Sequence, residues 1–163
     1  GRLSMICKVT ENSQLNACLN IIHKSFQTVA DDMGLTKENC PSHTAFMPLK
    51  KLQEQLKCGN SMFLYEYRNE LVGYFSLEVN GNSAELNNLS VFPEYRHFGI
   101  GKELVSFAVD YSKNTLGVNK LKIGIVDENT VLKEWYGKLG FVHTGTKHFE
   151  HLPFTVGFME LDI

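Results

Sequence analysis

Two glycines and an arginine form a pattern suited to a bound diphosphate. The stretch Arg96–Gly101 reads R-x-x-G-x-G, follows the extended run Ala84–Val91 and leads into the helix-like run Ile100–Leu116. A helix start presents unpaired backbone N–H groups and the positive end of the helix dipole. Glycines lack the Cβ atoms that would block a close approach, and the guanidinium can fork onto phosphate oxygens. The stretch therefore predicts a diphosphate-binding loop.

Two other phosphate-binding fingerprints do not fit this stretch. A Rossmann loop needs G-x-G-x-x-G, and the glycines here are not spaced that way. A Walker loop needs a hydroxyl residue after its lysine to hold magnesium, whereas Glu103 follows Lys102. An ordinary strand-to-helix turn, with glycines required only for geometry, stays open as the plain alternative.

A second motif lies downstream. Asp127-Glu128-Asn129 precedes the helical run Val131–Leu139, and Trp135–Phe141 reads aromatic-Tyr-x-x-Leu-Gly-Phe. In this order the two motifs resemble the signatures of the GNAT superfamily of N-acetyltransferases, and the resemblance covers roughly Ala84–Ile163. It implies one domain, 1–163, and acetyl-CoA as cosubstrate. The implied α/β fold has the order β-α-α-β-β-β-α-β-α-β-β, with a mostly antiparallel sheet splayed between its fourth and fifth strands.

The loop and the resemblance together nominate the residues that bind acetyl-CoA. A bulge in the fourth strand is expected to free backbone groups for pantetheine and for the thioester oxygen. An Asn after the fifth strand is expected to reach pantetheine or its water, although capping the next helix explains it equally well. The cofactor-binding candidates are Leu89, Ser90, Val91, Arg96, His97, Phe98, Gly99, Ile100, Gly101, Lys102, Asn129, Lys133 and Tyr136.

Tyr136 is the candidate for stabilising the leaving thiolate. It aligns with the family tyrosine that usually has this role. An ordinary tyrosine, with a pKa of about 10, would transfer its proton uphill to a thiolate near 8.5, so donation of a hydrogen bond is the simpler role. The alternative is an aromatic side chain packed in the core beside Trp135.

Glu85 is the candidate base. It lies six positions before Val91, where some histone-acetylating members of the family carry a catalytic glutamate. Many small-molecule members have Glu two positions later, at Asn87 here, and an amide cannot take a proton. Because the two residues share a strand face, Glu85 could act through a water near Asn87. A solvated surface glutamate is the alternative.

The acceptor amine is expected to bind between loops. His43 lies in the loop Leu35–Met47 and His151 in the connection Glu150–Pro153, and with Asn87 they are the substrate-binding candidates. Loop histidines are often incidental, so each has a plain alternative. No metal site is expected, and no cysteine falls in either motif.

Hydrophobic periodicity and turn residues predict the elements that position these groups. Asn12 or Ser13 is expected to cap the first helix, Gly34 to end it, Pro48 to start the second helix and Gly59 to end that one. The predicted strands are Ile6–Val9, Met62–Tyr67, Leu71–Val79, Ala84–Val91, Leu121–Ile125, Phe141–Phe149 and Phe154–Leu161.

Composition narrows the function classes. The 163 residues are 43% hydrophobic with a net charge of −2, which gives no general reason to bind nucleic acid or an anionic membrane. Cys7, Cys18, Cys40 and Cys58 show no metal or disulfide spacing, and Cys18 suits a helix core. No apolar run approaches the roughly 20 residues that span a bilayer, and no signal peptide is visible. Residues 1–4 are expected to precede a natural start at Met5.

These observations predict a cytoplasmic N-acetyltransferase, a monomer or homodimer, that acts by direct transfer in a ternary complex. Its acceptor is expected to be a primary amine of a small molecule or peptide. The rival is a non-catalytic acyl-CoA sensor of the same fold. A ribosome-associated or RNA-modifying member is a third possibility, which the acidic balance disfavours.

Overall fold

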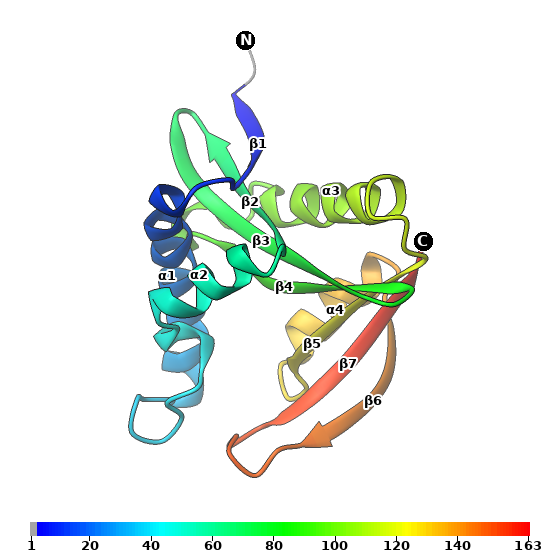
Figure 1. Ribbon diagram of the computed structural model, residues 1–163. Coiled ribbons are helices and arrows are strands. Elements are labelled where there is room, and N and C mark those ends of the chain that lie inside the picture. The colour runs from blue at the N-terminus through cyan, green and yellow to red at the C-terminus, as the bar shows by residue number, and fades with distance from the viewer. Residues whose placement is uncertain (1–2) are drawn as a thin grey trace.

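A computed structural model describes residues 3–163 as helices packed around one seven-stranded sheet (Figure 1). Residues 1–4 were expected to precede a natural start at Met5, and the first two of them, Gly1 and Arg2, lie outside the described range. The strands are β1 (Ser4–Lys8), β2 (Ser61–Tyr67), β3 (Glu70–Asn80), β4 (Ser83–Val91), β5 (Lys120–Val126), β6 (Val142–His148) and β7 (Thr155–Asp162). The helices are α1 (Leu15–Met33), α2 (Leu49–Lys57), α3 (Ile100–Asn114) and α4 (Thr130–Lys138). No helix within residues 3–163 combines the length and apolarity needed to cross a bilayer.

The sheet has the order β1-β2-β3-β4-β5-β7-β6. Neighbouring strands are antiparallel except β4 and β5, which are parallel. A parallel pair needs a crossover connection, and α3 supplies it between β4 and β5. The element order and the mostly antiparallel sheet confirm the expected mixed α/β fold.

The sheet opens between β4 and β5, as expected. The two strands pair only from Ser83 opposite Lys120 to Glu85 opposite Lys122. Beyond this point β4 continues to Val91 and β5 to Val126 without pairing, and Figure 1 shows the two ribbons diverging. The facing edges of both strands therefore keep backbone hydrogen-bonding groups that the ladder does not use.

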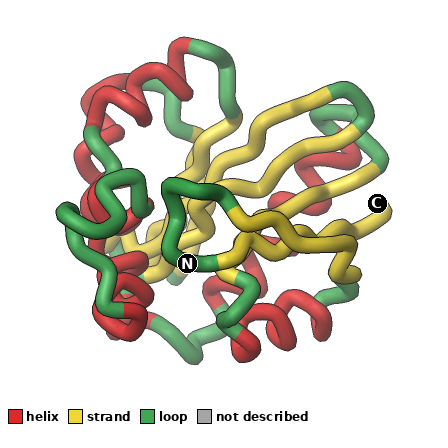
Figure 2. Tube along the Cα trace, turned by 90° about the horizontal axis from the view of Figure 1, so that it is seen from below, coloured by secondary structure: helices red, strands yellow, loops and turns green. Residues whose placement is uncertain are grey.

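Helices flank the sheet on both faces (Figure 2). Successive side chains of a strand point to opposite faces, and β3 shows this directly. The Phe75 ring packs edge-on to Phe107 of α3, with centroids 6.2 Å apart, while the preceding Tyr74 lies near Cys18 of α1. The α1 side chain Cys18 is fully buried, which confirms its expected place in the core and raises its pKa to about 12.

A bulge in β4 lies where the family resemblance implied one. Ser76 of β3 pairs with Asn87, but Tyr74 pairs with Ser90, so two residues of β4 oppose one residue of β3. Asn88 occupies the left-handed region, with φ 56°, and its carbonyl oxygen accepts a hydrogen bond from the Ser90 hydroxyl at 2.7 Å. The bulge bends the end of β4 away from β5.

Several predicted element ends shift by a few residues. The chain enters α1 through a 3₁₀ turn, Asn12–Gln14, so neither Asn12 nor Ser13 caps the helix as predicted. Instead, the Gln14 side chain accepts hydrogen bonds from the backbone N–H groups of Thr10 and Glu11. Pro48 is the N-cap of α2, and α3 ends at Asn114, before the predicted Leu116. Local side-chain hydrogen bonds, which periodicity does not encode, decide such ends.

Candidate active site

The loop from β4 to α3 has the backbone shape of an anion-binding nest. His97 (φ 71°) and Gly99 (φ 78°) both adopt left-handed conformations, and Gly99 is the N-cap of α3. Left-handed residues next to ordinary ones turn successive backbone N–H groups toward one point. The helix dipole adds positive potential there. This geometry suits a diphosphate, the ligand that the R-x-x-G-x-G pattern predicted.

The two glycines of the loop serve different needs. A Cβ on Gly99 would meet open space, so this position needs glycine for its positive φ. A Cβ on Gly101 would lie 3.3 Å from Cζ2 of Trp135, so glycine avoids a tight contact where α4 packs against the start of α3. Both glycines were expected to allow close approach by the ligand. At Gly101 the close approach is by the Trp135 ring.

Arg96 joins the loop to α1. Its Nη2 donates a hydrogen bond to the Ser25 carbonyl oxygen at 2.9 Å and lies 3.5 Å from the Ser25 hydroxyl. The side chain was predicted to fork onto phosphate, but in this structure one of its nitrogens is committed to α1. The other donors of this exposed guanidinium can still face an anion.

Ser25 also contacts the open edge of β4. The Phe92 N–H donates to the Val72 carbonyl of β3, so the preceding N–H of Val91 points to the opposite side, toward the opening. There it meets Ser25 Oγ at 3.3 Å. The sequence analysis did not single out Ser25, although a polar residue beside Ile22 and Phe26 on the apolar side of α1 was a usable signal.

Tyr136 lies on α4 and is only 5% exposed. Its ring packs edge-on to Trp135 and Phe141, with centroids 4.9 and 5.3 Å away. Burial alone raises the pKa of its hydroxyl well above the ordinary value. The phenol therefore keeps its proton at neutral pH and is suited to donate a hydrogen bond rather than to transfer the proton.

Glu85 occupies the last position at which β4 pairs with β5. It lies opposite Glu78 of β3, and Asn87 lies opposite Ser76, so Glu85 and Asn87 share one face of the sheet as predicted. Although the side chain is exposed, partial burial raises the pKa of its carboxyl group. Repulsion from Glu78 adds to this rise, and Lys122, its partner on β5, opposes it.

Hydrogen bonds and ion pairs of Asn129 and Asp127 stabilise the turn after β5. Asn129 Oδ1 accepts a hydrogen bond from the Leu132 N–H at 3.1 Å, which caps α4. The Lys133 ammonium lies 2.8 Å from Asp127 Oδ1, and His143 of β6 reaches the same oxygen at 2.9 Å. Lys133, predicted to bind the cofactor, is thus paired with a carboxylate, as is typical of a structural lysine.

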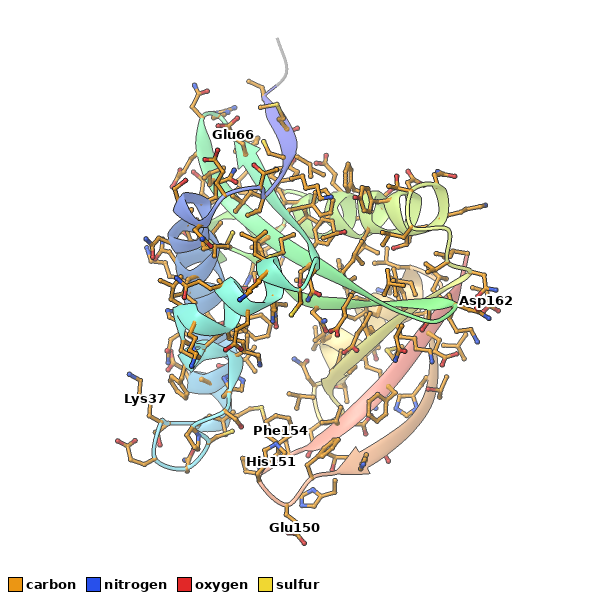
Figure 3. All side chains as sticks on the ribbon, viewed as in Figure 1. Lys37, Glu66, Glu150, His151, Phe154 and Asp162 are labelled. Atoms are coloured by element: carbon orange, nitrogen blue, oxygen red, sulfur yellow. The ribbon has the colours of Figure 1, made fainter. Side chains whose placement is uncertain are left out.

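The two predicted substrate histidines differ in their surroundings. His43 is buried among the rings of Phe26, Phe46 and Phe154, and its Nδ1 accepts the Ala45 N–H at 3.1 Å. Burial lowers its pKa, so His43 is neutral with its proton on Nε2. His151 is exposed on the connection from β6 to β7 (Figure 3).

The contact between His43 and Phe154 joins the loop after α1 to the connection between β6 and β7. Their ring centroids lie 6.4 Å apart, and the buried residues around them form a small apolar cluster, comprising Ala30, Leu35, Cys40, Ala45 and Phe154. Figure 3 shows the loop that carries Lys37 and the connection that carries Phe154 at the same end of the molecule. The loop after α1 and the connection between β6 and β7 therefore meet through packed apolar side chains.

A hollow of about 230 Å³ lies between α1 and the end of β5. Its lining is apolar at Val29, Met33 and Val126, and Asn129 belongs to it. The carboxylates of Asp32 and Glu128, neither singled out from the sequence, complete the lining. An apolar hollow edged by two carboxylates suits an amine that carries positive charge and alkyl groups.

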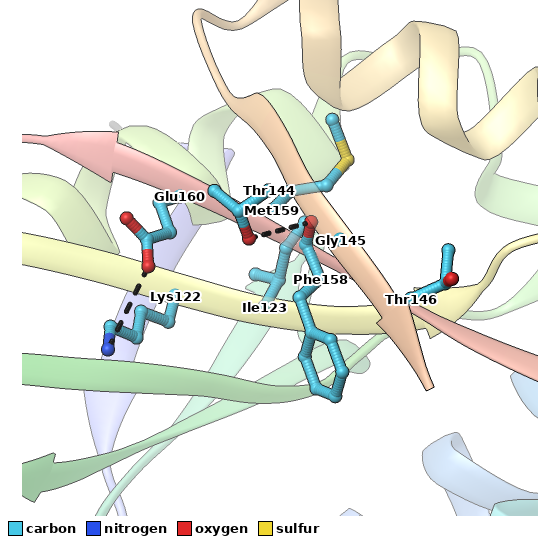
Figure 4. A pocket seen from close by; sticks show the side chains of 8 residues that line it. All are labelled: Lys122, Ile123, Thr144, Gly145, Thr146, Phe158, Met159 and Glu160. Carbon is cyan, nitrogen blue, oxygen red and sulfur yellow. Dashed lines mark hydrogen bonds and ion pairs between the residues drawn. The ribbon is translucent and has the colours of Figure 1, made fainter. Parts of the chain in front are cut away.

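A second hollow, of about 260 Å³, opens on the sheet face over β5, β7 and β6 (Figure 4). The ammonium of Lys122 lies 3.8 Å from a Glu160 carboxylate oxygen at its edge, and Phe158 and Thr144 lie nearby. This hollow contains none of the predicted site residues. The hollow at α1 includes Asn129, which was predicted to reach pantetheine, so an acceptor bound there would lie beside the expected cosubstrate arm.

Comparisons with known proteins agree with this fold. An uncharacterised N-acetyltransferase from Bacillus methanolicus is 35% identical over 92 residues, which cover 50% of this chain and 68% of the relative. A structure of PaiA N-acetyltransferase from Thermoplasma acidophilum in complex with coenzyme A matches 98% of this chain and 99% of its own, at 22% identity and TM-score 0.83.

A spermidine N-acetyltransferase from Vibrio cholerae, in complex with coenzyme A and spermine, has the same fold. It matches 98% of this chain and 95% of its own, at 20% identity and TM-score 0.73. The model of the acetyltransferase (GNAT) family matches residues 22–141. This match spans most of the chain, including both motifs, and the protein therefore belongs to the GNAT family of acetyltransferases.

Proposed function

We propose that this protein transfers the acetyl group of acetyl-CoA directly to a primary amine of a small molecule or peptide. The observation that carries the proposal is the nest of backbone N–H groups at Gly99, placed at the end of the strand that separates from β5. The nest suits the diphosphate, and the open edge suits an extended pantetheine arm. The bound cosubstrate supplies an acetyl group activated as a thioester.

The residues of the chain have distinct proposed roles. The Val91 N–H, which donates to Ser25 Oγ in this structure, would exchange that partner for the cosubstrate, with Leu89 and Ser90 shaping the bulged edge. The amine nitrogen forms the new C–N bond, the C–S bond breaks, and Tyr136 donates a hydrogen bond to the thiolate. Glu85 accepts the proton of the amine through a water beside Asn87, and its raised pKa makes it a better base than an ordinary glutamate.

We further propose that the acceptor is cationic and binds in the hollow at Asp32 and Glu128. Both carboxylates are exposed at the edge of an apolar lining, which matches an alkyl amine with more than one nitrogen. A second ammonium held by this edge would leave the reacting nitrogen free to point toward the opening. The complex of the related Vibrio cholerae enzyme with spermine supports this class of acceptor.

The alternative is an acyl-CoA sensor without turnover. Asn87, which stands where many small-molecule members carry glutamate, favours it. Release of free thiol from acetyl-CoA, measured with a panel of a polyamine, a monoamine and a peptide with a free N-terminus, separates the two functions. An enzyme releases thiol only with an accepted amine, whereas a sensor binds acetyl-CoA and releases none with any of them.

A charge variant tests the acceptor site. Asp32→Asn is expected to raise KM for the polyamine about 2- to 5-fold, because an exposed ion pair contributes up to about 1 kcal/mol. Asp31→Asn is the matched control, since the neighbouring Asp31 accepts a hydrogen bond from Gln27 and does not line the hollow. Equal KM values for the two variants would place the acceptor elsewhere.

A further inference from the structure

Three aromatic rings cluster beside the diphosphate loop. The ring centroids of Tyr67, Tyr95 and Phe98 lie 5.8 to 6.2 Å apart, and we call this group the aromatic platform. Tyr67 ends β2, Tyr95 lies in the 3₁₀ turn after β4, and Phe98 lies in the loop itself. Phe98 is 60% exposed, which is unusual for so large an apolar side chain.

Tyr67 and Tyr95 contact charged side chains, whereas Phe98 is largely open to solvent. The Tyr95 hydroxyl donates to a Glu70 carboxylate oxygen at 2.6 Å, and the Arg68 guanidinium lies 5.3 Å from the centroid of Tyr67. Tyr95 thus has a partner on β3, and Tyr67 lies beside the arginine that follows it in the chain. Phe98 packs against both rings and keeps most of its surface open to solvent.

We infer that the aromatic platform binds the adenine base of acetyl-CoA by stacking on Phe98. The inference rests on the proposed function, because it takes the diphosphate to lie at Gly99. Phe98 immediately precedes this glycine, the N-cap of α3. Only a ribose separates the adenine from the diphosphate, so the base lies within reach of residues that flank the loop. Aromatic side chains accept any base by stacking, with no hydrogen bond required.

Charge around the platform fits a nucleotide. Arg68 adds a cation beside Tyr67, and Arg96 and Lys102 flank the loop. Glu70 is the acidic group that contacts the platform, and one of its carboxylate oxygens accepts the Tyr95 hydroxyl. The purine, which is uncharged, is the part of the cosubstrate that can lie against this mixed surface without repulsion.

Calorimetry with two ligands tests this inference. Acetyl-CoA carries the adenosine, and the acetyl thioester of 4′-phosphopantetheine lacks it. Phe98→Ala is expected to weaken acetyl-CoA binding about 5- to 150-fold, the range found when a stacking ring is removed. Binding of the phosphopantetheine thioester is expected to stay unchanged. Phe98→Trp, which keeps a stacking surface, should retain the affinity of the wild type for acetyl-CoA.

Phe158→Ala is the matched control, because Phe158 is also an exposed phenylalanine but lies on β7, over the second hollow. Unchanged binding of acetyl-CoA by Phe98→Ala would overturn the inference and leave the platform as a surface for another protein. Equal losses for both ligands would also overturn it, since Phe98 would then only shape the loop. Failure of the wild type to bind acetyl-CoA would instead refute the proposed function itself.

Discussion

The guanidinium of Arg96 donates a hydrogen bond to the carbonyl oxygen of Ser25, although the two residues are 71 positions apart in the sequence. Ser25 belongs to α1, which lines the acceptor hollow, and Arg96 belongs to the loop that is proposed to hold the diphosphate. One side chain therefore connects the proposed diphosphate loop with the helix that lines the proposed acceptor hollow. The hydroxyl of the same serine faces the Val91 N–H at the open edge of β4.

Removal of this connection should affect both sites. Arg96→Ala is expected to lower the free energy of unfolding by about 1 kcal/mol, because a hydrogen bond from an exposed charge contributes less than a buried one. It should also raise KM for acetyl-CoA and for the acceptor. Denaturant unfolding and initial rates provide the measurements. Ser25→Ala, which keeps the carbonyl partner, should lower stability less; the reverse order would mean that the connection matters little.

Gly101 should tolerate no larger side chain. Gly101→Val is expected to cost about 1–3 kcal/mol of stability, because its Cβ would meet Cζ2 of Trp135 at 3.3 Å, and to weaken acetyl-CoA binding by displacing the start of α3. Gly137→Ala is the control on α4: a Cβ there meets open space, and alanine favours a helix by up to about 1 kcal/mol. Similar thermal unfolding of both variants would refute the packing argument.

Tyr136→Phe should separate chemistry from binding. The ring contacts with Trp135 and Phe141 remain, so folding and acetyl-CoA affinity are expected to stay near those of the wild type. Loss of the hydrogen bond to the thiolate should lower turnover about 10²-fold. Measurement of kcat beside calorimetric affinity checks both parts. Normal turnover would assign Tyr136 to core packing alone.

Glu85→Gln should slow the reaction at neutral pH and yet stabilise the fold. An alkyl amine with pKa near 10 is only about 0.1% neutral at pH 7, so loss of the base matters most there. The rate defect should shrink as pH rises. Because the folded protein raises the pKa of this carboxyl, its ionisation disfavours folding as pH rises through the raised value. The variant should therefore unfold at a higher temperature than the wild type at pH 7 and at the same temperature near pH 3.

The two outcomes for Glu85 are independent. Parallel pH–rate profiles would remove it as base and make the exposed His151 the next residue to test. Unequal unfolding temperatures near pH 3 would show that the substitution acts through packing rather than through charge. Neither result bears on the proposed diphosphate loop, which follows the other end of β4.

His43 should make stability depend on acid pH. Burial lowers its pKa below the ordinary 6.5, so the unfolded chain binds a proton that the folded chain resists. As pH falls below about 6.5, protonation of His43 in the unfolded chain should therefore lower the free energy of unfolding of the wild type. His43→Asn keeps an acceptor for the Ala45 N–H, so its unfolding should depend less on pH between 7.5 and 5. Identical pH dependence in melting experiments would contradict the burial of this ring as a neutral group.

The sequence by itself determined the fold class and the element order. It also predicted the diphosphate-binding loop. Alternation and helical periodicity are local properties, and the turn at Gly81, the end of α1 at Gly34 and the loop before α3 were readable because glycine adopts a positive φ without steric cost. The family motifs added the strand opening and the bulge. The register of β4 then confirmed that Glu85 and Asn87 share a face, since side chains in a strand alternate with a period of two.

Only the tertiary structure decided which partners the polar side chains have. Arg96 and Lys133 were predicted to bind the cosubstrate. In the structure Arg96 contacts Ser25 of α1 and Lys133 contacts Asp127, because proximity in space decides the partners. The proposed acceptor hollow combines the end of α1 with the end of β5, which are remote in the chain. At Gly101, likewise, a larger residue would crowd Trp135, a contact that no local pattern encodes.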